Sequence, residues 1–209
     1  MRKTLMIAVC ILLSLFVLTK ITSSGTKQDY TVNQNSVVLA FGDSITEGFG
    51  VKSDENYPYI LSNLLHVKVI NAGVSGEISA DGLKRLPKVL NEYKPNIVIL
   101  CHGGNDILRK YDLSQTKVNL QQMITMIESS GAKVVFLGVP SLNGFFISTN
   151  SIYKELAQTN NLIYDGDIIE KIVKSPSLKV DQIHPNKEGH ELLAQTINDL
   201  IRKNFNFNN

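Results

Sequence analysis

The sequence has no tryptophan, only two cysteines and six prolines, and no large excess of charge of either sign. Its 21 lysine and arginine residues nearly balance 19 acidic residues, and three of the cations (Arg2, Lys3 and Lys20) fall in a leading segment without acids. The rest of the chain therefore lacks the basic surplus that attracts nucleic acid by counterion release. With 43% hydrophobic residues among 209, the composition excludes a disordered or fibrous protein and predicts a globular domain.

Residues 1–24 have the pattern of an export signal. A short basic stretch precedes an apolar run of 14 residues, 5–18, which is interrupted only by Ser14. As a helix this run reaches about 21 Å, short of the roughly 30 Å hydrocarbon core of a bilayer. No A-x-A cleavage pattern follows it, so a cleaved signal peptide and an uncleaved inner-membrane anchor both remain open. We expect an exported protein, periplasmic or secreted, whose only membrane contact is this segment if it is retained.

The polar residues 25–35 are expected to form a linker, and residues 36–209 the functional domain. Cys10 lies in the leading segment, so after cleavage Cys101 would be the only cysteine and no intramolecular disulfide could form. The fold must then be held by its core.

Short runs rich in β-branched residues alternate with amphipathic segments along the domain. Strands are expected at 37–41, 67–70, 97–100, 134–139 and 162–164, and helices at 57–65, 78–90, 116–129, 152–158 and 187–203. Pro87 inside the second helical pattern argues against an unbroken helix there. The alternation predicts an α/β fold with a parallel sheet of about five strands and helices on both faces.

Polar, glycine-bearing turns follow three successive strands. They are Gly42-Asp43-Ser44, residues 71–76 and residues 103–106. Turn chemistry alone explains any one of them, because Gly, Asn and Asp dominate loops. Because the carboxyl ends of parallel strands meet at one edge of a sheet, where such folds bind ligands, the three turns together predict a site.

Asp181 and His184 form a further candidate pair in a loop before the last helix. A carboxylate three residues before a histidine can reach back to its Nδ1–H, which leaves Nε2 free to act as a base. Ser44 is the hydroxyl that such a base would activate. A surface histidine next to a helix start is the alternative interpretation.

Taken in order, Gly42-Asp43-Ser44, Gly76, Gly104-Asn105-Asp106 and Asp181-x-x-His184 resemble the four sequence blocks of the SGNH (GDSL-type) hydrolases. Residues 71–90 (NAGVSGEISADGLKRLPKVL), 102–106 (HGGND) and 183–186 (IHPN) are similar to the bacterial thioesterase I/lysophospholipase/arylesterase branch. The resemblance covers about residues 37–203. The G-x-S-x-G elbow of the α/β-hydrolases is absent, which argues against that fold.

The resemblance implies a flavodoxin-like three-layer αβα sandwich and a serine ester hydrolase that uses a Ser-His-Asp triad. Ser44 would be the nucleophile, His184 the general base and Asp181 the residue that holds the imidazole. The backbone N–H groups of Ser44 and Gly76 and the side-chain amide of Asn105 would form the oxyanion hole. No metal and no organic cofactor are implied.

Gly76 suits the donor role because a residue without Cβ permits a tight turn that aims its N–H at the reacting oxygen. Gly73, nearer the strand end, is the second choice. Asp43, Asn71 and Asp106 are interpreted as residues that brace their loops.

The substrate is expected to be a small acyl ester or thioester of short to medium chain length, lysophospholipid included. Residues 107–114 and 140–148 would border the crevice, and the second of these segments is expected to be a loop. Candidate pocket residues in them, for which ordinary packing is an equal explanation, are Ile107, Leu108, Phe145, Phe146 and Ile147. The enzymatic alternative is an O-acetylesterase acting on cell-wall or other extracellular carbohydrate. The non-enzymatic alternative is a flavodoxin-like module that binds a nucleotide or FMN, against which the absence of G-x-G-x-x-G and Walker patterns argues.

Overall fold

The structure, a computed structural model, describes residues 30–143 and 146–208. Its central sheet has five parallel strands in the order β3-β2-β4-β5-β8. These strands are β2 (Val37–Gly42), β3 (Lys68–Gly73), β4 (Ile97–Cys101), β5 (Lys133–Leu137) and β8 (Ile163–Asp165). Counted along the chain the order is 2-1-3-4-5, the flavodoxin-like arrangement, so the predicted fold class is confirmed.

The two central strands of this sheet are apolar along nearly their whole length because helices cover both of its faces. Residues 38–41 of β2 and residues 97–100 of β4 have no solvent exposure. They pair in register from Val38↔Ile97 to Gly42↔Cys101, which places the polar residues that follow both strands at the same edge.

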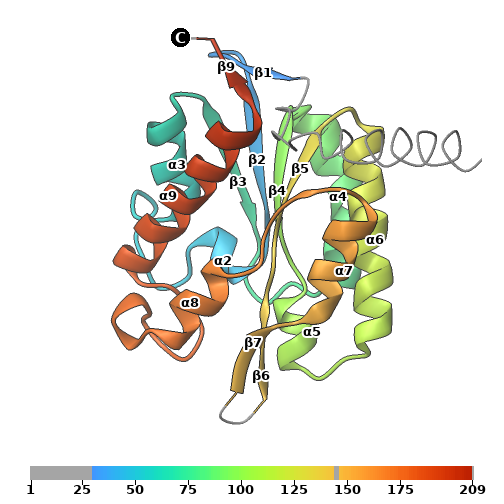
Figure 1. The fold of residues 1–209 in the computed structure, drawn as a ribbon, viewed down its shortest axis with the longest axis vertical. Coiled ribbons are helices and arrows are strands. Elements are labelled where there is room, and N and C mark those ends of the chain that lie inside the picture. The colour runs from blue at the N-terminus through green and yellow to red at the C-terminus, as the bar shows by residue number, and fades with distance from the viewer. Residues whose placement is uncertain (1–29, 144–145, 209) are drawn as a thin grey trace, which may run out of the picture.

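In the described part of the chain, the five helices of nine or more residues cover the two faces of the sheet (Figure 1). Helices α3 (Tyr57–Leu65) and α9 (Lys187–Asn204) lie together on one face, and α4 (Ser79–Tyr93), α6 (Leu113–Ser129) and α7 (Ser151–Thr159) lie on the other. Four of the five have a side-chain N-cap, from Asn56, Asp112, Asn150 and Asn186. Helix α4 continues without a break through Pro87, which is exposed, so the expected helix 78–90 is present despite this proline.

Shorter elements connect the layers, namely α2 (Ser44–Glu47), α5 (Gly104–Leu108), α8 (Ile168–Lys174) and the 3₁₀ turn η1 (Pro176–Leu178). Residues 140–148 were expected to be a loop, and this expectation is wrong. The segment forms an antiparallel hairpin of β6 (Pro140–Asn143) and β7 (Phe146–Thr149), in which main-chain pairing satisfies groups that a loop would leave to water.

The expected linker 25–35 also needs correction in its second half. Strand β1 (Thr31–Val32) pairs in parallel with β9 (Asn206–Phe207), and Val32 is completely buried. The folded body therefore begins before residue 36. The expected signal segment 1–24 lies outside the described residues. Within the described ranges, no helix combines the length and apolar character that crossing a membrane requires.

Candidate active site

The candidate site lies where β2, β3 and β4 end. The strand order reverses between β2 and β4, and crevices at such switch points are where open α/β sheets bind ligands. Ser44 opens α2 directly after β2, Gly76 lies in the turn after β3, and Asn105 lies in α5 after β4. The loop that follows η1 brings His184 to the same edge.

Ser44 is the first residue of the short helix α2. Asp43 caps this helix, because its Oδ1 accepts a hydrogen bond from the Ile45 N–H at 3.2 Å. Burial raises the pKa of Asp43, against the opposing charge effect of His102. A residue at the first position of a helix has no intrahelical acceptor for its N–H, so the Ser44 N–H remains available to a ligand.

Ser44, His184 and Asp181 form a chain of hydrogen bonds. The distance from Ser44 Oγ to His184 Nε2 is 2.9 Å, and that from His184 Nδ1 to Asp181 Oδ2 is 2.7 Å. The other carboxylate oxygen of Asp181 accepts the backbone N–H groups of Ile183 and His184, each at 2.9 Å. A charged Asp181 fixes the proton on Nδ1, which makes Nε2 the acceptor for the serine hydroxyl.

The local environment keeps Asp181 ionised. Partial burial alone would raise its pKa, but hydrogen bonds from the backbone of His184 and Ile183 and from the His184 ring lower the pKa to about 2. The ring of Phe49 packs against the His184 ring with centroids 4.5 Å apart. The imidazole is therefore held by a carboxylate at one edge and by an aromatic ring against its face.

Residues 74–77 form a tight turn after β3, closed by a hydrogen bond of 3.1 Å from Glu77 N–H to Val74 O. Gly76 has φ of +77°, the left-handed value that the third position of a type II turn requires. A Cβ on Gly76 would have only Arg109 Nη2 near it, at 3.6 Å, so backbone conformation rather than space calls for glycine here. The Gly73 N–H, in contrast, already donates to Asn71 Oδ1 at 2.9 Å.

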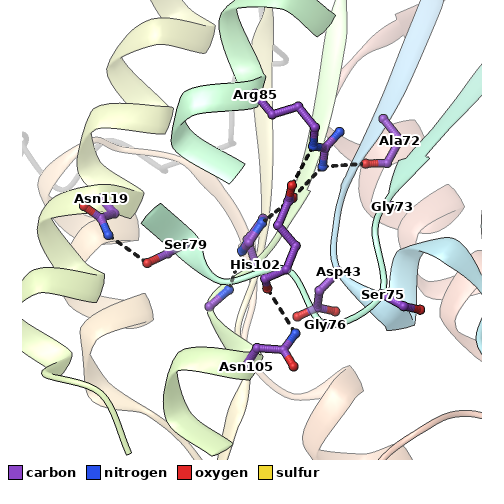
Figure 2. A network of polar contacts seen from close by, with 12 residues as sticks. Asp43, Ala72, Gly73, Ser75, Gly76, Ser79, Arg85, His102, Asn105 and Asn119 are labelled. Atoms are coloured by element: carbon purple, nitrogen blue, oxygen red, sulfur yellow. Dashed lines mark hydrogen bonds and ion pairs between the residues drawn. The ribbon is translucent and has the colours of Figure 1, made fainter. Parts of the chain in front are cut away.

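Asn105 and the turn are connected directly. Asn105 Nδ2 donates to the backbone carbonyl of Glu77 at 3.0 Å. A side-chain amide has two N–H donors, so one remains for a ligand. Figure 2 shows Asn105 below His102 and beside Gly76 and Asp43.

The three bracing residues make the contacts expected of them. Asp106 accepts hydrogen bonds from Ser79 N–H at 2.8 Å and Ser79 Oγ at 2.6 Å, which ties α5 to the start of α4. Asn71 Nδ2 donates to Glu47 O at 3.1 Å and so ties β3 to α2. Asp43 caps α2 as described above, and these interpretations are confirmed.

A small hollow of about 40 Å³ opens beside Ser44 and Asn105. Its apolar lining is formed by Ile45, Leu108, Val139, Ile169, Val173 and Ile183. Of the pocket candidates from the sequence, Leu108 lies in this lining. Among the described residues, Ile107 and Ile147 pack instead against the core, and Phe146 is 80% exposed. Phe145 lies outside the described residues.

Sequence reasoning missed a buried charge cluster behind the turn. Glu77 pairs with Arg85 and His102, although none of the three was predicted to belong to the site. The signal available was a carboxylate placed directly after Gly76. The hollow's residues on α8 were missed as well, because their apolar pattern is that of ordinary core.

The described part of the chain contains no group of three or more His, Cys, Asp and Glu side chains suited to a metal ion. Cys101 is buried, and burial raises the pKa of its thiol well above the usual value. It therefore has the environment of a packing residue rather than of a thiolate nucleophile.

Comparison with known proteins identifies the family of the chain. The chain is 31% identical to an arylesterase of Vibrio mimicus over 170 residues, which cover 77% of this chain and 85% of that protein. It is 29% identical to thioesterase 1/protease 1/lysophospholipase L1 of Escherichia coli (strain K12) over 164 residues, 75% of this chain and 79% of that protein. It is 26% identical to an acetylxylan esterase of Geobacillus stearothermophilus over 203 residues, 78% of this chain and 93% of that protein.

Among solved structures, the esterase EstA from Pseudoalteromonas sp. superposes with a TM-score of 0.73 at 22% identity, over 81% of this chain and 98% of that chain. This likeness concerns the fold. Residues 40–192 match the GDSL-like lipase/acylhydrolase family, and this segment contains every strand of the central sheet beyond the first three residues of β2. The chain therefore belongs to the GDSL-like lipase/acylhydrolase family and is an SGNH-type ester hydrolase.

Proposed function

We propose that this protein hydrolyses short- to medium-chain acyl esters or thioesters through a triad of Ser44, His184 and Asp181. The observation that carries the proposal is the unbroken chain of hydrogen bonds from Ser44 Oγ to His184 Nε2 and from His184 Nδ1 to Asp181 Oδ2, at 2.9 and 2.7 Å. Both distances lie within the range that proton transfer between a nucleophile and its base requires.

In the first half of the reaction, Ser44 Oγ attacks the acyl carbonyl while His184 Nε2 takes the hydroxyl proton. The imidazolium is stabilised by the Asp181 carboxylate and returns the proton to the leaving alcohol or thiol as the carbonyl–heteroatom bond breaks. In the second half, water attacks the acyl-serine and loses a proton to His184, which returns that proton to Ser44 Oγ as the acyl–oxygen bond breaks and the acid is released.

The negative charge on the carbonyl oxygen would be stabilised by three donors, namely the N–H groups of Ser44 and Gly76 and the free amide N–H of Asn105. They come from the ends of three adjacent strands, so the sheet itself holds them in place before substrate arrives. Donors that need no rearrangement during the reaction are the most effective kind, and loss of one typically costs about 2.7–4 kcal/mol of transition-state stabilisation.

The apolar hollow beside Ser44 is the proposed acyl site. A cavity needs a volume of about 10–15 Å³ to hold one water molecule. The hollow, at about 40 Å³, therefore has room for a few heavy atoms of a substrate. This favours the short end of the proposed range, and Leu108 and Val139 would contact the first carbons of the chain. Longer chains would have to extend out of the hollow along the surface.

An O-acetylesterase acting on carbohydrate is the second candidate. Two observations favour it, the small hollow and the similarity to the acetylxylan esterase. Release of acetate from acetylated glycan without turnover of butyryl or octanoyl esters would favour this candidate over the first.

A chain-length series of p-nitrophenyl esters, measured with the natural protein and with Ser44→Ala, tests the proposal. We expect the rate to be highest for acetyl to hexanoyl esters and to be lost in Ser44→Ala. Labelling with a fluorophosphonate, mapped by mass spectrometry, should modify Ser44. Equal ester turnover in both proteins would remove the mechanism.

We also propose that the enzyme acts after export, on the strength of the basic and apolar pattern of residues 1–24. The mass of the protein recovered from the cell envelope and medium distinguishes a cleaved from a retained segment. Recovery from the cytoplasm alone would contradict export.

A further inference from the structure

Glu77 is held on its main-chain side at two points. Its N–H closes the turn on Val74 O, and its carbonyl accepts the Asn105 side-chain amide. Glu77 is therefore connected to both proposed oxyanion donors outside α2, because it follows Gly76 directly in the sequence and its carbonyl oxygen accepts the hydrogen bond from Asn105. A movement of Glu77 would displace both donors together.

The Glu77 side chain turns inward and is fixed more firmly still. Its carboxylate accepts Arg85 Nε at 2.7 Å and Arg85 Nη2 at 2.6 Å, a two-point contact, and faces His102 Nε2 at 3.1 Å. The Glu77 side chain is only 8% exposed and that of His102 not at all. The contacts with Arg85 and His102 outweigh the effect of burial and lower the pKa of Glu77 to about 2. It is an anion under all ordinary conditions.

The partners of Glu77 are themselves fixed. The Gly103 N–H donates to His102 Nδ1 at 2.9 Å, so the ring proton is on Nε2 and points at Glu77. Helix α4 passes so close at Gly82 that a Cβ there would lie 2.3 Å from His102 Nε2. Arg85 also donates to Ala72 O at 3.1 Å (Figure 2). Its guanidinium lies over the Phe41 ring, 4.2 Å from the ring centroid. The cluster thus joins the ends of β2, β3 and β4 to α4.

We propose that Glu77 is a positioning residue of the oxyanion hole, whose clamped carboxylate sets the place of the Gly76 N–H and of the Asn105 amide. The proposal rests on the proposed function, because it presumes that these groups bind the oxyanion. An oxyanion donor must lie about 2.7–3.1 Å from the reacting oxygen, and a misplacement of about 1 Å can cost on the order of 100-fold in rate. A buried carboxylate bound at three points supplies that accuracy.

The alternative is that the cluster only stabilises the fold, and Glu77→Ala separates the two roles. We expect kcat to fall about 10- to 100-fold with KM within about 2-fold, because the donors act chiefly on the transition state. Affinity for an alkyl trifluoromethyl ketone, which forms an oxyanion on the nucleophile, should fall in parallel with kcat/KM. The pH dependence of kcat/KM should keep its midpoint, since His184 and Asp181 are untouched. Glu77→Gln, which keeps the shape and one acceptor for Arg85, should recover part of the loss.

A double-variant cycle with Asn105→Ala sharpens the test. Because part of the effect of Glu77 passes through Asn105, Glu77→Ala should cost at least about threefold less in the Asn105→Ala background than in the natural protein. The matched control is Asp81→Ala, which removes an exposed carboxylate of α4 paired with Lys84 and should leave kcat unchanged.

Glu77→Ala with kcat within about twofold of the natural protein, whatever its melting temperature, would overturn the proposal, as would a lowered kcat with unchanged ketone affinity. If Glu77→Ala does not fold, Glu77→Gln and Arg85→Lys carry the test through the same parallel loss of kcat and ketone affinity. If both variants keep the kcat and the ketone affinity of the natural protein, the proposal is overturned. Activity that survives in Ser44→Ala would instead refute the proposed function itself, so the two failures are distinguishable.

Discussion

His190, on α9 behind the site, should make the protein lose stability in mild acid. The residue is fully buried, its Nδ1 accepts the Tyr57 N–H at 3.2 Å, and its ring stacks on Tyr57. Within the described chain its Nε2 has no hydrogen-bond partner. Burial, with a smaller effect from His184, lowers the pKa of His190 from 6.5 to about 4.

Proton uptake by His190 determines whether acid raises or lowers the stability of the protein. Between pH 6.5 and about 4, the unfolded chain binds a proton at His190 and the folded chain does not, so the free energy of unfolding falls as the pH falls. From pH 7.5 to 5 the two pKa values give a loss of about 2 kcal/mol from this one residue. Asp181 and Glu77 are carboxylates whose pKa values are lowered to about 2 by folding. Their contribution to the free energy of unfolding is lost only at lower pH, as the pH falls from their ordinary pKa values towards 2.

Urea unfolding of the natural protein and of His190→Asn at several pH values measures this effect. The asparagine keeps an acceptor for the Tyr57 N–H and cannot titrate. It should be less stable at pH 7.5, because the stacked ring is lost, but the natural protein should lose about 2 kcal/mol more than the variant between pH 7.5 and 5. His66→Asn, at an exposed histidine with left-handed φ that asparagine tolerates, is the control and should keep the natural slope. A constant stability difference between the natural protein and His190→Asn would refute the reasoning.

Other predictions concern the site. Asn105→Ala should lower kcat by about 100- to 1000-fold with little change in KM, as measured by steady-state ester hydrolysis, because one transition-state donor is lost. Gly76→Ala should also lower kcat, and should destabilise the protein by about 1–2 kcal/mol in urea titration, because a residue with a Cβ resists the left-handed conformation. Asp181→Asn should lower kcat by as much as about 10⁴-fold by favouring the wrong tautomer of His184. Since the pKa of Asp181 is about 2, protonation of this carboxylate should not lower the rate at ordinary assay pH, which a pH–rate profile of the natural enzyme checks.

Much of the architecture could be predicted from the sequence because the signals are local. Runs such as 37–41 and 97–100 are short, continuously apolar and rich in β-branched residues, which is the pattern of a strand covered from both sides. The ends of the elements depend on their partners in the sheet. Strand β5 ends at Leu137 rather than at residue 139, because Leu137 pairs with Asp165, the last residue of β8, and Val139 beyond it lines the hollow.

The same reasoning predicted Ser44, Gly76 and Asn105 at one edge, since strand ends in a parallel sheet share an edge. His184 follows no strand and was assigned instead from its spacing to Asp181 and from the family resemblance. Sequence reasoning could not find the pairing of β6 with β7, because each strand has only four residues and gives no long periodic pattern. Nor could it find the Glu77 cluster. Contacts between residues 8 and 25 apart join a glutamate, an arginine and a histidine that each look like surface residues in the sequence.

The pairing of β1 with β9 determines where on the protein an N-terminal attachment would lie. These strands lie beside the start of β2, whereas Ser44 follows its end, so the six residues of β2 separate them by roughly 20 Å (Figure 1). A tether, tag or solid support attached ahead of residue 30 would therefore hold the protein at the end opposite the proposed active site. Immobilisation through that end should leave the entrance facing outward and free to receive bulky substrates.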